Sequence, residues 1–325
     1  MHGGSRHLTQ LPIFAISLIL LLYYSSLPPF YLSFVSVALS VPPLLYLGTE
    51  ALHSASMELS HRLGLSARNS GQYLLSVASV VDEIALVAVA VVYRQDSIAL
   101  GAILGSSVVT LAAFLLIMPW AVPEGIRQFR RDGIFLVVPA ALLLLATFLP
   151  QGQEIYGTGM LAVAAAYVVL SRSGTGDETV EGEVAPPPGG LVSALSCASV
   201  VVGAWLLVRS TESISMHYSL NPLVASFIVA GIVESLPEIV MLAISLVRDP
   251  SETSTGIVSG SSIYKATAIL AVPLLAGQVL IGGYHRIPAL FLITALLFLA
   301  YTFFRQRKIS VAVTLTVLVV SAFLL

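Results

Sequence analysis

Four carboxylic acids interrupt apolar stretches of this sequence, where lipid-facing segments carry only hydrocarbon side chains. Glu234 and Glu238 flank Pro237 in the middle of one long apolar run, and Asp82 and Glu83 lie together in an earlier run. A charged side chain at bilayer depth costs about 2.5 kcal/mol or more even on the mildest insertion scale, so such residues indicate a functional site. Carboxylate oxygens are the ligands that hard cations prefer. We therefore interpret the two pairs as facing halves of one cation site.

The neighbours of these acids extend the predicted site. Glu234 lies one helical turn before Glu238 on the same face, and two like charges there are expected to share a proton. Asp82 points about 100° away from Glu83 around a helix, so it faces either this site or another helix. Lys265 lies about twelve residues from either end of its apolar run, too far for its amine to reach the interface. We expect Lys265 to pair with a carboxylate of the site.

The composition indicates a membrane protein. The chain has 325 residues, of which 57% are hydrophobic and only 10% charged, and its mean hydropathy is +0.95. Apolar runs of about 18 to 25 residues predict transmembrane helices, whereas a β-barrel would show short alternating segments. The single cysteine, Cys197, excludes an internal disulfide, and no basic run suggests a nucleic-acid partner.

Ten apolar runs predict the core helices. An eleventh, from residue 11 to about 27, is expected as a retained N-terminal helix, with a signal peptide as the alternative because its core is short. Residues 172–190 are rich in glycine, proline and acids, which is typical of a flexible linker. The ten predicted helices span residues 31–60, 70–93, 97–119, 133–149, 154–171, 191–217, 221–247, 253–277, 286–304 and 309–324.

The positive charges predict the orientation. With the N-terminus inside and eleven spans, only Arg94 and Arg286 of the 15 lysines and arginines lie in outside loops, and only Arg209 and Lys265 lie within spans. The others fall in inside loops, as the positive-inside rule requires. The sequence therefore predicts a multi-pass protein, placed in the cell membrane, with a cytoplasmic N-terminus and linker.

The two halves of the chain repeat each other at an offset of 155 residues. Glu83 falls on Glu238, and Gly105-Ser106-Ser107 falls on Gly260-Ser261-Ser262. Five spans separate each element from its copy, and an odd number inverts the second copy relative to the first, as in many secondary transporters. We predict an all-α polytopic membrane protein with ten core transmembrane helices in two inverted five-helix repeats, plus one extra N-terminal helix. The predicted segments are 1–30 (extra or signal-like helix), 31–171 (first repeat), 172–190 (linker) and 191–325 (second repeat).

Each repeat pairs an acidic helix with a second helix that opens with Gly-x-x-x-Gly-Ser-Ser. The glycines allow helices to approach closely, and Pro237 removes one backbone donor and so frees a carbonyl. Helix packing alone for the glycines, and hydrogen bonds to their own helix for the serines, are the simpler alternatives. The predicted packing residues are Gly101, Gly105, Gly256, Gly260 and Pro237.

These motifs resemble the cation/calcium exchanger superfamily, which includes sodium/calcium and proton/calcium antiporters. Residues 233–238 are similar to its Gly-Thr-Ser-Leu-Pro-Glu helix, with a weaker copy at 78–83, and residues 105–110 and 260–265 resemble its Gly-Ser-x-x-x-Asn/Asp motif. The resemblance covers about residues 31–325. It implies that Glu83 and Glu238 are the central metal ligands. The resemblance also implies four hydroxyl ligands, which here are Ser79, Ser235, Ser106 and Ser261. The Asn/Asp position of the family corresponds to Thr110 in the first repeat and Lys265 in the second.

The sequence departs from the family pattern at three positions. Lys265 stands where the family has an acid or amide, Glu234 where it has threonine, and Asp82 where its first repeat has proline. A fixed positive charge at Lys265 weakens the case for sodium coupling. We expect Lys265 to act as a tethered cation that pairs with Glu234 or Glu238 in one state, and Glu234 to restore the lost negative charge.

The resemblance implies an antiporter that exchanges a cation against H⁺ or Na⁺ by alternating access, with Ca²⁺ as the favoured cation. Its partners would be the lipid bilayer and the transported ions, with no other cofactor and no enzymatic activity; the oligomeric state stays open. The alternatives are another cation or small solute on the same fold, an intramembrane enzyme, or a non-transporting scaffold. Against an enzyme, Asp82 is the only midspan aspartate, and the six histidines show no His-x-x-x-His spacing.

Overall fold

The fold is helical throughout the part of the chain that the structure covers. This computed structural model describes residues 52, 54–65, 69–121, 130–149, 151–171, 190–248, 252–276 and 286–305. Seven helices in these ranges are long and apolar enough to cross a membrane, or eight if one bent pair is a single span. The predicted N-terminal helix, most of the 31–60 helix, residues 172–189 of the linker and the 309–324 helix lie outside the described residues.

The described helices coincide with predicted spans, and their ends differ by less than about one turn. Their apolar composition explains this agreement, because a run long enough to cross the bilayer must satisfy its backbone groups within a helix. The elements are η1 (Ser70–Leu75), α5 (Ser76–Ser79), α6 (Val81–Val92), α7 (Asp96–Ala121), α8 (Arg130–Phe148), α9 (Gln153–Ser171), α10 (Gly190–His217), α11 (Pro222–Arg248), α12 (Glu252–Tyr264), η3 (Lys265–Ile269), α13 (Leu270–Leu275) and α14 (Arg286–Arg305).

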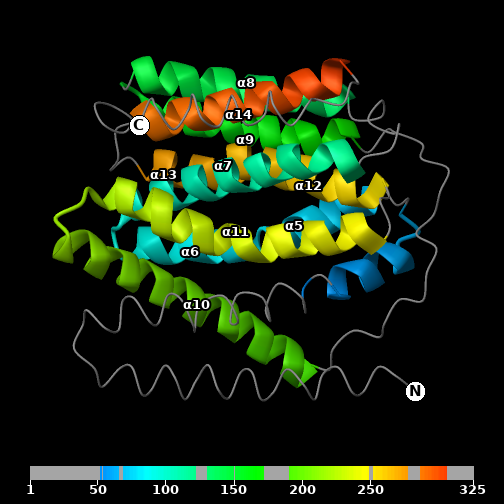
Figure 1. The fold of residues 1–325 in the computed structure, drawn as a ribbon, viewed down its shortest axis with the longest axis horizontal. Helices are drawn as coiled ribbons and strands as arrows, with labels where there is room; N and C mark the ends of the chain where they lie inside the picture. The colour runs from blue at the N-terminus through cyan, green and yellow to red at the C-terminus, as the bar shows by residue number, and fades with distance from the viewer. Residues whose placement is uncertain are drawn as a thin grey trace.

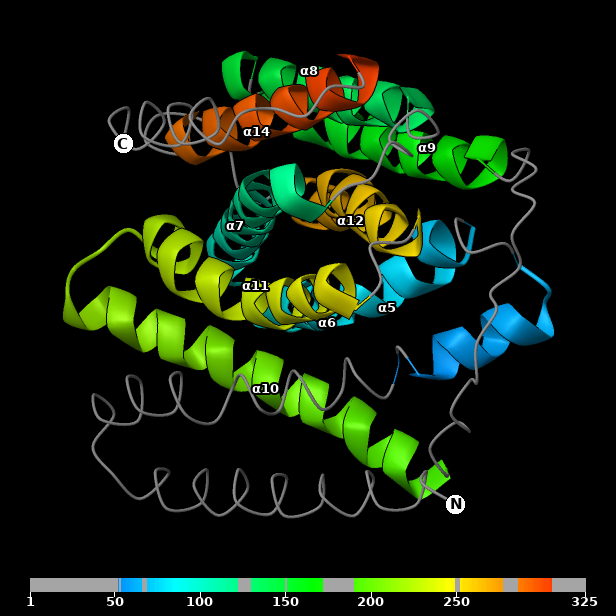
Figure 2. The ribbon, with the colours of Figure 1, turned by 45° about the vertical axis from the view of Figure 1, so that its right-hand side comes forward.

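The helices form layers. Helices α8, α9 and α14 lie together on one side, α7 and α12 occupy the middle, and α5, α6 and α11 lie beyond them, with α10 crossing their outer side obliquely (Figures 1 and 2). In the middle, α7 packs along α11, and α12 packs along η1 and α5. The acidic helices and the Gly-Ser-Ser helices of the two predicted repeats are therefore adjacent at the centre.

Glycines allow these central helices to touch backbone to backbone. A Cβ added at Gly105 would lie 2.1 Å from the carbonyl oxygen of Phe227, and one added at Gly260 would lie 2.6 Å from the carbonyl oxygen of Gln72. Both distances are too short for any side chain, so α7 meets α11, and α12 meets η1, at positions where only glycine fits. The same close contact is thus made once by each Gly-Ser-Ser helix.

Two of the three helices that carry the charged groups are irregular next to those groups. The first breaks at Val80 (φ −111°, ψ 14°), where α5 and α6 meet at a bend of 44°. The other changes from an α-helix to the π-helix η3 at Lys265. Such π-helical segments occur frequently at functional sites. The irregularities set the directions of Asp82, Glu83 and Lys265.

Candidate cation site

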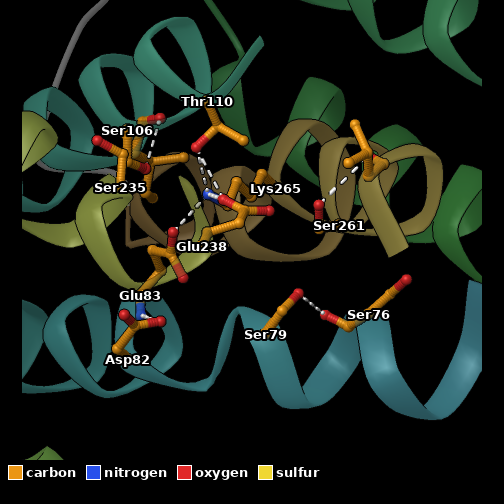
Figure 3. A network of polar contacts seen from close by, with 12 residues as sticks. Ser76, Ser79, Asp82, Glu83, Ser106, Thr110, Ser235, Glu238, Ser261 and Lys265 are labelled. Carbon is orange, nitrogen blue, oxygen red and sulfur yellow. Dashed lines mark hydrogen bonds and ion pairs between the residues drawn. The ribbon is translucent and has the colours of Figure 1, made fainter. Parts of the chain in front are cut away.

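A buried lysine joins the two glutamates that the repeat pairs with each other. The Nζ atom of Lys265 lies 2.5 Å from Oε1 of Glu83 and also forms an ion pair with Oε2 of Glu238 (Figure 3). All three residues are at most 2% exposed. Because η3, α6 and α11 supply one residue each, the ion pairs join both predicted repeats at one point.

Thr110 completes the contact from α7. Its hydroxyl donates a hydrogen bond of 2.8 Å to Oε2 of Glu238 and accepts one of 3.4 Å from Nζ of Lys265. Glu238 Oε2 therefore receives a hydroxyl and an ammonium together, and charge-assisted hydrogen bonds of this kind are stronger than neutral ones. The structure thus brings four predicted site residues together: Glu83, Glu238, Thr110 and Lys265.

The other two acids are buried beside this cluster, and neither forms an ion pair with a described residue. Asp82 lies in the first turn of α6, where its Oδ1 accepts the backbone N–H of Glu83 at 3.1 Å. Glu234 is 1% exposed, and neither of its carboxylate oxygens has a hydrogen-bond partner among the described residues. The charge of Glu83 repels Glu234, and the charge of Lys265 attracts it.

The four predicted serine ligands lie around the ion pairs but donate to their own helices. Ser79 and Ser261 lie on one side of Lys265 in Figure 3, and Ser106 and Ser235 on the other. Each hydroxyl donates to the carbonyl three residues earlier, which is the simpler alternative stated above. Their lone pairs remain available, so the hydroxyls surround the charges without contacting them.

The predicted packing residues occupy the contacts around this cluster. Gly101 and Gly105 of α7 lie against α11, Gly260 of α12 lies against η1, and the carbonyl of Gly256 accepts a hydrogen bond from Ser76 at 3.3 Å. Pro237 lies inside α11, which continues as one helix through it. The bend occurs instead in the first-repeat helix, at Val80, although that helix has Asp82 where the family has proline.

The charges of the cluster do not balance. Four carboxylates (Asp82, Glu83, Glu234 and Glu238) face one ammonium (Lys265), which leaves −3 if all are ionised (+1 − 4). Uncompensated charge is costly in a buried site, so this arrangement favours uptake of protons or cations. Among the described residues, no three acidic, histidine or cysteine side chains are placed to share one metal ion. With Lys265 paired to both glutamates, its amine holds the position that the resemblance assigns to the metal.

Sequence reasoning missed a further buried acid outside the central cluster. Asp132, at the start of α8, is fully buried and accepts hydrogen bonds from Gln72 and Ser259. Our predicted helix begins one residue later, at 133, because Asp132 directly follows two arginines and reads as part of a charged loop. Only the packing of α8 against η1 and α12 shows that it is buried.

Comparison with known proteins identifies the family. A family model described as sodium/calcium exchanger protein matches residues 32–172 and 189–325. Because the match covers most of the sequence, the chain belongs to the sodium/calcium exchanger family. No curated sequence matches the chain.

Solved structures show the same fold. The crystal structure of the H⁺/Ca²⁺ exchanger CAX is similar with a TM-score of 0.73 and 14% identity over 97% of this chain and 87% of that one. The structure of native YfkE gives 0.72 and 15% identity over 97% and 98%. The sodium-calcium exchanger NCX_Mj gives 0.61 and 18% identity over 94% and 99%. At these identities the likeness establishes the fold.

Proposed function

We propose that this chain is a secondary active antiporter that exchanges a cation against H⁺ or Na⁺ by alternating access, with Ca²⁺ as the favoured cation. The observation that carries the proposal is the placement of the Lys265 amine against Glu83 and Glu238. Those are the carboxylates that the family resemblance assigns to the metal. In this proposal the amine is an internal cation that leaves the carboxylates when the transported ion enters, and returns when it departs.

The inverted-repeat architecture also belongs to this proposal. Gly105 meets Phe227, and Gly260 meets Gln72, and the offset of 155 residues that relates Gly105 to Gly260 also relates Gln72 to Phe227. The same contact made twice supports a repeat at this offset. Ten core helices in two inverted repeats, with an extra N-terminal helix, are part of the proposal. A cytoplasmic N-terminus, placement in the cell membrane and transport without a cofactor or covalent chemistry complete the proposal.

Protons are the counter-ion that the electrostatics favour. Glu234 has no hydrogen-bond partner among the described residues, and it lies near the charge of Glu83. A buried carboxyl in this position is most stable when it carries a proton or lies beside a cation. Glu234 and Asp82 are therefore the candidate proton carriers, and Lys265 opposes the entry of a second small cation such as Na⁺. CAX, an H⁺/Ca²⁺ exchanger, is the corresponding precedent on this fold.

The test is uptake of radioactive Ca²⁺ into proteoliposomes that hold the purified protein, driven in turn by a pH gradient and by a sodium gradient. We expect uptake on the pH gradient and its loss in Glu238→Gln, which keeps the side-chain shape but removes the charge. Uptake that persists in Glu238→Gln would contradict the assigned site. Absence of Ca²⁺ uptake on either gradient would show that Ca²⁺ is not the transported cation. Mg²⁺, Mn²⁺, Na⁺ and K⁺ would then be tested in the same assay.

A further inference from the structure

Asp132 joins three elements away from the central ion pairs. It lies in the first turn of α8 and is fully buried, and its Oδ2 accepts hydrogen bonds from Gln72 Nε2 of η1 at 2.6 Å and Ser259 Oγ of α12 at 2.5 Å. A carboxylate, an amide and a hydroxyl from three separate helices therefore meet at one point. None of these three residues belongs to the site described above.

In the described part of the chain, the side-chain amide of Gln72 has one unpaired hydrogen-bond acceptor at this point. Its Oε1 is buried and has no hydrogen-bond partner among the described residues, while its Nε2 contacts Asp132. A half-turn of this amide exchanges its oxygen and nitrogen, and would bring Oε1 beside Asp132. An unsatisfied buried acceptor costs about 1–3 kcal/mol, and a cation at this point would satisfy it.

A polar stripe on the first-repeat helix leads from this point to the central site. Gln72, Ser76, Ser79 and Glu83 follow one another at spacings of four, three and four residues, across the π-helix η1 and the bend at Val80. All four are at most 1% exposed. This stripe (the η1 stripe) therefore spans at most about 16 Å from Gln72 to Glu83, at 1.5 Å per residue.

A second stripe on α12 faces the first. Ser259, Ser262 and Lys265 follow at intervals of three residues, and all are buried. The Ser76 hydroxyl lies 3.3 Å from the carbonyl oxygen of Gly256 and 3.1 Å from that of Ile257, so the η1 stripe contacts the backbone of α12. Ser262 Oγ, like Gln72 Oε1, has no hydrogen-bond partner among the described residues. Buried polar side chains of both stripes therefore lie between Asp132 and Lys265.

The residues that correspond to Gln72 and Ser259 in the other repeat are apolar. At the offset of 155 residues, Gln72 corresponds to Phe227 and Ser259 corresponds to Leu104. Leu104 is fully buried, and Phe227 packs against the same apolar core. Helix α14, which follows the second Gly-Ser-Ser helix as α8 follows the first, contains no acid. The polar route is therefore specific to the side at which α8 begins.

We propose that Asp132, Gln72 and Ser259 form a second, peripheral site for a hard cation, which the transported ion occupies between the central site and the end of the bundle where α8 begins. The inference rests on the proposed transport function. Carboxylate, amide and hydroxyl oxygens are the ligand types that Ca²⁺ takes. Binding requires only that the Gln72 amide turns its oxygen, and the Ser259 hydroxyl its lone pair, toward the ion beside Asp132.

Binding of Mn²⁺ to purified protein, measured from the electron paramagnetic resonance signal of the free ion, tests the site without transport. The background is Glu83→Gln with Glu238→Gln, which disables the central site. We expect this double variant to retain one weak Mn²⁺ site, with Kd on the order of 10⁻³ M. Adding Asp132→Asn should abolish it. Retention of the same binding with Asp132→Asn would overturn the proposal, as would a double variant that binds no Mn²⁺.

A variant that should bind Mn²⁺ more tightly provides a second test, because a gain of affinity cannot result from misfolding. Ser259→Asp adds a second carboxylate within hydrogen-bond reach of Asp132, so in the same background Mn²⁺ should bind at least about tenfold more tightly. Ser199→Asp, at a serine equally buried in α10, is the matched control and should leave Mn²⁺ affinity unchanged. Equal affinities in the two variants would overturn the site. A parent protein that binds Mn²⁺ at Asp132 but moves no cation would instead contradict the transport function alone.

Discussion

Lys265 donates a hydrogen bond of 3.4 Å to Thr110, the residue 155 positions earlier in the chain. Since 155 is the offset of the predicted repeat, each is the counterpart of the other, and a residue that touches its own counterpart lies beside the axis that relates the repeats. Only one of the two is charged. A single ammonium therefore serves the glutamates of both halves, and substitutions at 265 should affect both halves together.

Replacing Lys265 with methionine should make the stability of the protein depend on bound cations. Methionine keeps most of the length of the side chain but leaves Glu83 and Glu238 buried together without a counter-charge. Removing one partner of a buried ion pair costs about 3–5 kcal/mol. At about 2 °C per kcal/mol for a chain of this size, the Tm in detergent should fall by about 5–10 °C and rise again with added Ca²⁺.

The matched control for Lys265→Met is Arg209→Met. Arg209 forms a partly exposed ion pair with Glu212 at 3.0 Å, and such pairs contribute about 0–1 kcal/mol. Its Tm should stay within about 2 °C of the parent, with no added response to Ca²⁺. An equal, calcium-independent fall in both variants would mean that Lys265 has only a packing role.

Replacing Lys265 with aspartate should create sodium-dependent exchange. The change removes the tethered cation and restores the acid that the family resemblance places at this position, so a small monovalent ion gains a carboxylate and loses a repulsive charge. We expect sodium-driven Ca²⁺ uptake in proteoliposomes of Lys265→Asp and none in the parent. Sodium-driven uptake by the parent would show that Lys265 does not exclude Na⁺.

Hydropathy and spacing predicted the described helices and the closeness of Glu83, Glu238 and Lys265. Ordinary apolar runs set the helix bounds, since a spanning segment has few alternatives to a helix. The pairing of Glu83 with Glu238 followed from an offset in the sequence, and the isolation of Lys265 from both ends of its span predicted a carboxylate partner. That it contacts both glutamates depends on how closely α7, α11 and α12 approach, which their glycines permitted but did not specify.

Other features depend on three-dimensional packing that has no local sequence signal. The helix breaks at Val80, where no proline or glycine marks a bend, while α11 passes through Pro237 as one helix. The helix becomes π-helical at Lys265, where no glycine or proline marks a change. Asp132 follows two arginines at a helix start, so only the burial of α8 beneath its neighbours distinguishes it from a loop acid.

Replacing Thr110 with valine should weaken the affinity of the central site while leaving its ion pairs. Valine has nearly the same shape, but it removes the hydroxyl that donates to Glu238 at 2.8 Å. Hydrogen bonds to charged groups contribute about 1.5–3 kcal/mol, so the apparent affinity for the transported cation should change by about tenfold or more. Initial rates of Ca²⁺ uptake over a concentration series measure it. Thr294→Val, which removes only a hydroxyl bonded to its own helix, should match the parent.

Replacing Gly105 with alanine should prevent the central helices from closing. The new Cβ would lie 2.1 Å from the Phe227 carbonyl oxygen, and a backbone atom cannot rotate away as a side chain can. Overpacking of this kind costs about 1–3 kcal/mol or more, so the Tm should fall by several degrees and transport should be lost with it. Gly159→Ala in α9 is the control, because its Cβ would lie 3.4 Å from Leu142 Cδ1, an ordinary contact. Alanine stabilises a helix by about 1 kcal/mol relative to glycine, so the Tm of Gly159→Ala should equal or exceed that of the parent. An undiminished Tm in Gly105→Ala would show that α7 and α11 are farther apart in the membrane than in this structure.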